Sequence, residues 1–187
     1  MMNQRIRQLA GFLRQLIEGQ ALADVQRKFA EQLVQITADE LGQAENLLVS
    51  EGLSIETIQR ASGQHTDLVS KSIEPVLFPE SQQPDQTPGH PAFVLKGENA
   101  GLSDFLARRL KPDLETYLSS LTEPARLNLR SAAEDLQTVD QHYNRKENVF
   151  FPYLERQGIT APPQVMWGVD DIIRSLIKLF IESIDQQ

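Results

Sequence analysis

The sequence predicts an all-α protein, built from an N-terminal bundle of short helices and a second, up-and-down helical bundle. Apolar residues recur at spacings of three and four along nearly the whole chain, as they do on one face of a helix. Capping residues and glycine stops separate these periodic segments. No segment alternates apolar and polar residues as a half-buried strand does, so the pattern leaves no place for a sheet.

Residues 1 to about 70 are expected to form four short amphipathic helices joined by tight turns. Thr37 and Glu40 have the spacing of a capping box, in which each side chain accepts from a free backbone N–H at a helix start. Gly52 is placed to end that helix in the left-handed conformation, and Ser54 is placed to begin the next helix. The expected helices cover residues 3–18, 22–36, 38–51 and 55 onwards.

A proline-rich segment separates the two helical regions. Five of the ten prolines fall between Pro75 and Pro91, with Gln, Ser, Asp and Thr between them. Such a composition favours an extended connector without a core of its own. We therefore expect an N-terminal helical domain at residues 1–72, a linker at 73–89 and a second helical domain at 90–187.

The second region is expected to begin with a helix at Pro91, since proline is favoured in a first turn. That helix should break at residues 111–112, because proline lacks an N–H and restricts the residue before it. A long helix should run from the N-cap Thr122 to Phe151, where Pro152 should kink or end it. A last helix, with a broad apolar face, should follow from residue 162.

Composition excludes several classes of function. A net charge of −8 without a basic stripe argues against nucleic-acid binding. The absence of cysteine excludes disulfides, thiolate metal sites and cysteine nucleophiles. No window has the roughly 20 apolar residues of a membrane span, and the N-terminus lacks a signal peptide's apolar centre, so we expect a cytoplasmic protein. No Ser/His/Asp arrangement or phosphate-binding loop is present, so an enzyme is not expected.

Carboxylates interrupt the apolar stripes of the second region. The four that lie in register with core-type residues are Glu98, Asp140, Glu147 and Asp170. An unpaired buried carboxylate costs several kcal/mol, so a metal ion, a basic partner, a proton or exposure at the edge of the seam must compensate. The basic residues available as partners are Arg145, Lys146 and Arg174.

Histidine spacing does not favour a metal chelate within one helix. Ligands four residues apart share a helix face, but the residue four after His142 is Lys146, which cannot bind a metal while charged. Glu147 lies about 140° around the helix from His142, and His90 lies about 12 Å along the helix from Glu98. A metal would have to gather single ligands from different helices. Such a His and carboxylate set suits iron or manganese, with zinc also possible.

Both halves of the chain resemble known families. Residues 13–69, "LRQLIEGQALADVQRKFAEQL…ITADELGQAENLLVSEGLSIETIQRASGQHTDLV", are similar to the family of bacterial helical domains called domain of unknown function 438. The runs "GHPAFVLKGEN", "HYNRKENVFFPYLE" and "PPQVMWGVDDIIR" resemble the hemerythrin-like HHE cation-binding domain that usually follows it. The resemblance implies a four-helix bundle with a non-haem di-iron centre that binds or senses oxygen. The matching polar positions are His90, Glu98, His142, Glu147 and Asp170.

This chain departs from the pattern that the resemblance implies. Phe93 stands where a second histidine is typical, and Lys146 stands where the His-x-x-x-Glu pair would have its carboxylate. Asp170 and Asp171 occupy a segment that often carries a histidine. The chain also stops at Gln187, before a further bundle helix, so an incomplete bundle is expected.

Two functional hypotheses follow. The first is a hemerythrin-like cation-binding or oxygen- and redox-sensing module with a degenerate site for iron, another divalent metal or no metal. The second is a metal-free helical module for dimerisation or signalling. In either case the apolar last helix would leave an exposed apolar patch, so we expect a homodimer that pairs through it.

Overall fold

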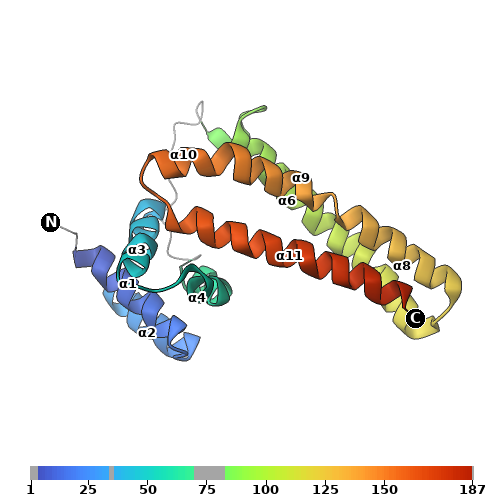
Figure 1. The fold of residues 1–187 in the computed structure, drawn as a ribbon, viewed down its shortest axis with the longest axis horizontal. Coiled ribbons are helices and arrows are strands. Elements are labelled where there is room, and N and C mark those ends of the chain that lie inside the picture. The colour runs from blue at the N-terminus through green and yellow to red at the C-terminus, as the bar shows by residue number, and fades with distance from the viewer. Residues whose placement is uncertain (1–3, 34–35, 70–82, 187) are drawn as a thin grey trace. The chain divides into compact units, whose positions relative to one another are not determined.

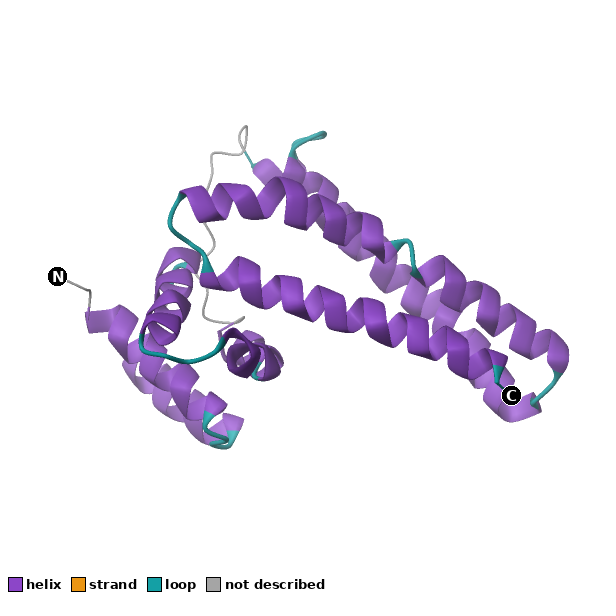
Figure 2. Ribbon diagram, in the orientation of Figure 1, coloured by secondary structure: helices purple, strands orange, loops and turns teal. Residues whose placement is uncertain are grey.

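The structure is a computed structural model that describes residues 4–33, 36–69 and 83–186. The described residues are almost entirely helical and contain no strand, which confirms the all-α prediction (Figures 1 and 2). The chain divides into two compact units. Unit 1 comprises Met1–Val76 and Phe151–Val169, and unit 2 comprises Leu77–Phe150 and Asp170–Gln187.

Unit 1 is a cluster of short helices around one apolar core. Its core includes Leu9, Leu13, Val25, Leu48 and Ile58, all fully buried. Its helices are α1 (Gln4–Ile17), α2 (Leu22–Gln32), α3 (Ala38–Ser50), α4 (Ile55–Arg60), α5 (Ser62–Val69), α10 (Phe151–Arg156) and the first part of α11 (Ala161–Asp185).

Local capping chemistry places the helix ends of unit 1. Thr37 and Glu40 form the predicted capping box at the start of α3. Gly52 adopts the expected positive φ of +95°, and the Ser54 hydroxyl accepts from the backbone N–H of Thr57 at the start of α4. Asn46 secures the turn before α11, because its Nδ2 donates to the Gly158 carbonyl at 2.8 Å. The predicted roles of Thr37, Gly52 and Ser54 are confirmed, whereas the helix expected over residues 22–36 ends at Gln32.

Unit 2 contains long helical rods that run up and down beside one another (Figure 1). Buried residues that join the rods include Leu129, Ala133, Val139, Tyr143, Ile177 and Ile184. The first rod comprises α6 (Pro91–Phe105), the π-helical turn η3 (Leu106–Leu110) and α7 (Lys111–Ser120); the second comprises α8 (Glu123–Leu136), α9 (Val139–Arg145) and the π-helical turn η4 (Lys146–Phe150). Residues 170–185 of α11 form the third rod of the described part.

The break predicted at Pro112 was wrong, and the helix does not end at Pro152 either. The backbone stays helical through Pro112 and through Pro152. In both places a π-helical turn of five residues ends shortly before the proline, at Leu110 and at Phe150. A π turn bonds each residue to the fifth along, so the widened turn can accommodate the missing N–H and the bulky ring without ending the helix.

The second π turn also changes which residues face inward. Phe150 stands three residues after Glu147, so a continuous α-helix would turn it inward, but Phe150 is 38% exposed and Phe151 is 1% exposed. A π turn inserts one extra residue per turn, which moves the buried position one place along the chain. The predicted inward position of Asp140 was also wrong, since its side chain is 52% exposed.

Residues 73–82 of the predicted linker lie outside the described residues. Its last part contains a short 3-10 turn, η2 (Pro84–Gln86), before α6 begins. Within the described ranges, none of the helices has the length and apolar character required to cross a membrane.

Leu121 generates a first prediction. It caps α7 in the left-handed conformation, with φ +49°, and its side chain is 70% exposed. This conformation costs a non-glycine residue roughly 1–2 kcal/mol, part of which glycine's greater backbone entropy offsets. Leu121→Gly should therefore raise the free energy of unfolding by about 0.5–1 kcal/mol in urea titrations. The control Leu118→Gly, at a 63% exposed position inside α7, should lower it by about 1 kcal/mol. Equal losses in both variants would contradict the prediction.

Glu45 generates a pH prediction for unit 1. It lies on α3 beside a mainly apolar cavity of about 380 Å³, and burial raises its pKa to about 7. Below pH 4.5, the ordinary pKa, protonated Glu45 makes its full contribution to the free energy of unfolding. That contribution is lost as the pH rises toward 7, because Glu45 then ionises in the unfolded chain while burial opposes its ionisation in the folded state. Because the side chain is only half-buried, we expect a loss of about 1–2 kcal/mol.

Glu45→Gln should flatten this pH dependence, because the amide does not titrate in this range. Urea unfolding between pH 4.5 and pH 8 measures this pH dependence. The fluorescence of the single tryptophan, Trp167, reports it, because Trp167 belongs to unit 1. Parallel curves for the wild type and the variant would contradict the assignment to Glu45.

Candidate functional site

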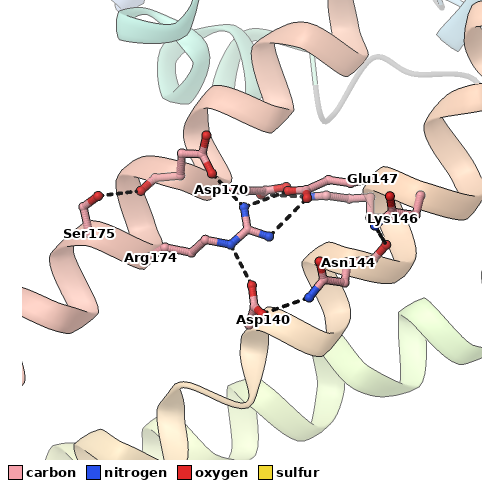
Figure 3. Close-up of polar contacts among 9 residues, drawn as sticks. Asp140, Asn144, Lys146, Glu147, Asp170, Arg174 and Ser175 are labelled. Carbon is pink, nitrogen blue, oxygen red and sulfur yellow. Dashed lines mark hydrogen bonds and ion pairs between the residues drawn. The ribbon is translucent and has the colours of Figure 1, made fainter.

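A buried charged centre lies between η4 and α11 in unit 2 (Figure 3). Arg174 on α11 binds Glu147 with two parallel hydrogen bonds, Nη1 to Oε1 at 2.9 Å and Nη2 to Oε2 at 3.1 Å. The side chain of Glu147 is only 5% exposed. Bidentate pairs of this kind are the strongest geometry available to a guanidinium and a carboxylate. The hydrogen bonds to Glu147 are the largest cause of the raised pKa of Arg174, so Arg174 stays charged.

A second ion pair lies beside the first. Lys146 Nζ donates to Asp170 Oδ1 at 2.8 Å, and Asp170 is 2% exposed. Its other oxygen, Oδ2, is buried and accepts no hydrogen bond within the described part of the chain. Burial raises the pKa of Asp170, the bond from Lys146 lowers it, and the like charge of Glu147 raises it again. The pKa of Asp170 is raised on balance, and the contact from Lys146 is the one that favours the ionised carboxylate.

Tyr143 joins the two ion pairs. Lys146 Nζ lies 5.0 Å from the centre of its ring, and the Arg174 guanidinium carbon lies 5.2 Å from it. A cation within about 6 Å of an aromatic face is attracted by the electron density of the ring. Burial, and then the nearby charge of Asp170, raises the pKa of Tyr143, so it remains a neutral phenol. One buried ring therefore helps to hold both cations.

Two exposed carboxylates complete the surroundings of Arg174. Its Nε donates to Asp140 Oδ1 at 2.7 Å, and its Nη1 also donates to Asp171 Oδ1 at 2.9 Å. Asn144 Nδ2 donates to the other oxygen of Asp140 at 2.8 Å. These contacts fix the rotamer of Arg174 from the solvent side and leave its paired face directed at Glu147.

A separate cluster joins α6 to α9. His142 Nδ1 lies 2.9 Å from Glu98 Oε2, and Arg145 Nη1 donates to Glu98 Oε1. Burial, and then the charge of Lys146, lowers the pKa of His142, so the imidazole is neutral near pH 7. A carboxylate only accepts, so Nδ1 of the neutral ring carries the proton that it donates to Glu98.

The five predicted site residues therefore separate into two pairs and an outlier. Glu98 and His142 meet, as ligands gathered from different helices would. Glu147 and Asp170 are neighbours, and each has its own basic partner. His90 is exposed at the N-cap of α6, where its Nδ1 accepts from the backbone N–H of Ala92 at 3.1 Å. Across the described ranges, His90 makes no polar contact with the other four.

This donor set does not fit a metal ion. Within the described ranges, no group of three or more His, Asp or Glu residues lies close enough to hold one. Both oxygens of Glu147 are bound by Arg174, and both oxygens of Glu98 are bound by His142 and Arg145. The remaining oxygen, Asp170 Oδ2, is a single donor, whereas a stable site needs several.

Several residues of the centre lie outside the predicted site residues. Lys146 and Arg174 were named only as available ion-pair partners, and the roles of Tyr143 and Asp171 beside Arg174 were not predicted. The sequence carries a signal for this arrangement, because Asp170 and Asp171 stand four and three residues before Arg174 on one helix.

The comparison with protein families agrees with this architecture. Residues 9–75 match a family described as a family of unknown function, DUF438. Residues 90–187 match the hemerythrin HHE cation binding domain. The chain belongs to the hemerythrin HHE cation-binding family. Neither the curated proteins nor the solved structures contain a match to this chain.

Membership in this family supports a cation-binding module, and the two matches confirm the predicted succession of domain types. The positively charged groups that the structure places beside the carboxylates of this hemerythrin-like domain are basic side chains. The family model describes a domain that binds cations, and in the described part of this chain basic side chains lie beside the carboxylates.

The Arg174–Glu147 pair generates a prediction. Arg174→Met leaves Glu147 buried without its partner, and we expect a loss of about 2–4 kcal/mol in the free energy of unfolding. Arg174→Met combined with Glu147→Gln should recover more than half of that loss, because the uncompensated charge is gone. Chemical unfolding followed by circular dichroism measures both values.

The matched control is Arg130→Met. Arg130 pairs with Glu134 and Asp185 at a more exposed site, so we expect a clearly smaller loss of stability than for Arg174→Met. Equal effects of Arg130→Met and Arg174→Met would show that burial of the pair does not govern its contribution.

Proposed function

We propose that this chain is a non-enzymatic helical association module, in which the hemerythrin-like domain pairs with a second copy of the chain. The observation that carries the proposal is an exposed apolar stripe on α11. Ile172, Leu176 and Leu179 are 53%, 57% and 59% exposed, and they follow one another at spacings of four and three. This is the spacing at which one helix packs against another in a coiled coil.

The stripe lies on a different face of α11 from the core. The core side of the helix carries Asp170, Ile173, Ile177 and Ile184, which are buried or half-buried. Clustered exposed apolar side chains of this size mark an interaction surface more often than single ones do. Pairing of two identical stripes about a two-fold axis would bury both at once, and such pairs are the commonest oligomers.

Neutralised carboxylates support a role in association over one in oxygen or redox sensing. Oxygen chemistry at a di-iron centre needs carboxylate and histidine ligands free to bind metal, and here Glu98, Glu147 and Asp170 are bound by basic or imidazole side chains.

Self-association is tested by sedimentation or light scattering of the full chain. The wild type should be a dimer, and Leu176→Glu should be a monomer with an unchanged circular dichroism spectrum, because a charge at the centre of the stripe opposes pairing. The control Leu127→Glu changes a 51% exposed leucine on α8 and should leave the dimer intact. A monomeric wild type, or dissociation by Leu127→Glu as well, would contradict the proposal.

The family match favours a second candidate, a metal-bound sensor. Metal analysis and absorption spectra after anaerobic iron loading separate the two. The association module predicts less than about 0.1 iron per chain and no iron-to-ligand absorption. A stoichiometric metal content would favour the sensor instead.

A further inference from the structure

We infer that Lys146 and Arg174 take the place of metal ions in this bundle and supply, as fixed side-chain charges, the cations that its buried carboxylates require. The inference concerns the charged centre of unit 2 and does not depend on self-association. It rests on the balance of charge, the geometry of the ion pairs and the position of both cations over one ring.

The charges of the buried centre balance without any added ion. Glu147 and Asp170 are 5% and 3% exposed at their side chains, and each carries one negative charge when ionised. Lys146 and Arg174 bring two positive charges, at 2.8 Å and 2.9 Å from those carboxylates. A divalent ion added to this centre would leave it with excess positive charge in a poorly hydrated site.

The pairing is specific in geometry. Arg174 covers both oxygens of Glu147, so a metal could bind Glu147 only after that bidentate pair had opened. Lys146, at the first position of the π turn η4, donates to Oδ1 of Asp170. Lys146 and Glu147 stand three and four residues after Tyr143, so both lie on the helix face that Tyr143 occupies, one as a cation and one as an anion.

The same principle extends to the neighbouring cluster. Glu98 is shared between His142 and Arg145, so the third carboxylate of the predicted ligand set also has a basic partner. Each of the three therefore meets a different basic side chain: Arg145, Lys146 or Arg174. Side-chain cations cannot dissociate or change oxidation state, so the centre keeps its charge whatever the metal supply.

The inference predicts that removing the cations creates a demand for metal. In the double variant Lys146→Met/Arg174→Met, two buried carboxylates face each other uncompensated, and the melting temperature should fall. Addition of Zn²⁺ or Mn²⁺ at 1 mM should then raise it by about 5 °C or more, because the ion binds the folded state selectively. The wild type should show neither this rise nor a fall when EDTA is added.

The control is Lys178→Met, which removes a 77% exposed cation from α11. Its melting temperature should stay near that of the wild type and should not respond to the divalent ions. If the double variant does not fold, Lys146→Gln, which keeps a hydrogen-bond donor near Asp170, is measured in the same way and should show a smaller rise.

Two results would overturn the inference. One is a wild type that loses stability in EDTA and regains it with metal, since a metal would then bind while Lys146 and Arg174 are present. The other is a set of folded variants at Lys146 and Arg174 that keep the wild-type melting temperature and ignore added metal, since the two side chains would then compensate no buried charge.

Discussion

The structure of the hemerythrin-like domain depends on neutralising the carboxylates of Glu147 and Asp170. Both lie in a stripe of apolar residues, where an unpaired charge would cost a large share of a domain's stability. Arg174 and Lys146 remove that cost, and Tyr143 holds them both. The helices that contribute these residues can therefore bury their apolar faces together, because the charged positions between those faces are satisfied.

The π turn at Lys146–Phe150 lets this helix pass a proline without ending. Lys146 and Glu147 stand three and four residues after Tyr143, so one helix face carries all three toward the charged centre. Pro152 has no N–H to donate to the carbonyl four residues before it, and the π turn ends two residues before this proline. The turn thus keeps the helix continuous and moves the next buried position from Phe150 to Phe151.

Local features of the fold could be predicted from the sequence, and features set by contacts between helices could not. The capping box of Thr37 and the left-handed Gly52 depend on neighbours within a few residues, and both were predicted correctly. The break at Pro112 was predicted wrongly, because a proline alone does not show that a π turn will absorb it. The α-helical register placed Glu147 and Asp170 inside but also Asp140, which lies at the edge of the seam. The pairing between the three basic residues and the carboxylates depends on how each helix is rotated about its axis. The sequence pattern alone does not give that rotation.

Helix α11 connects the charged centre with the exposed stripe. Asp170 and Arg174 stand one turn apart and are fixed by Lys146 and Glu147. Ile172, Leu176 and Leu179 belong to another face of the same helix, so the rotation that satisfies the ion pairs also holds the stripe toward solvent. An apolar stripe alone would favour turning inward, since burial of each such side chain is worth roughly 1.5–3 kcal/mol. The ion pairs oppose that rotation, because it would leave Glu147 and Asp170 buried without partners. The buried charges thus determine which apolar residues of α11 remain available to a partner.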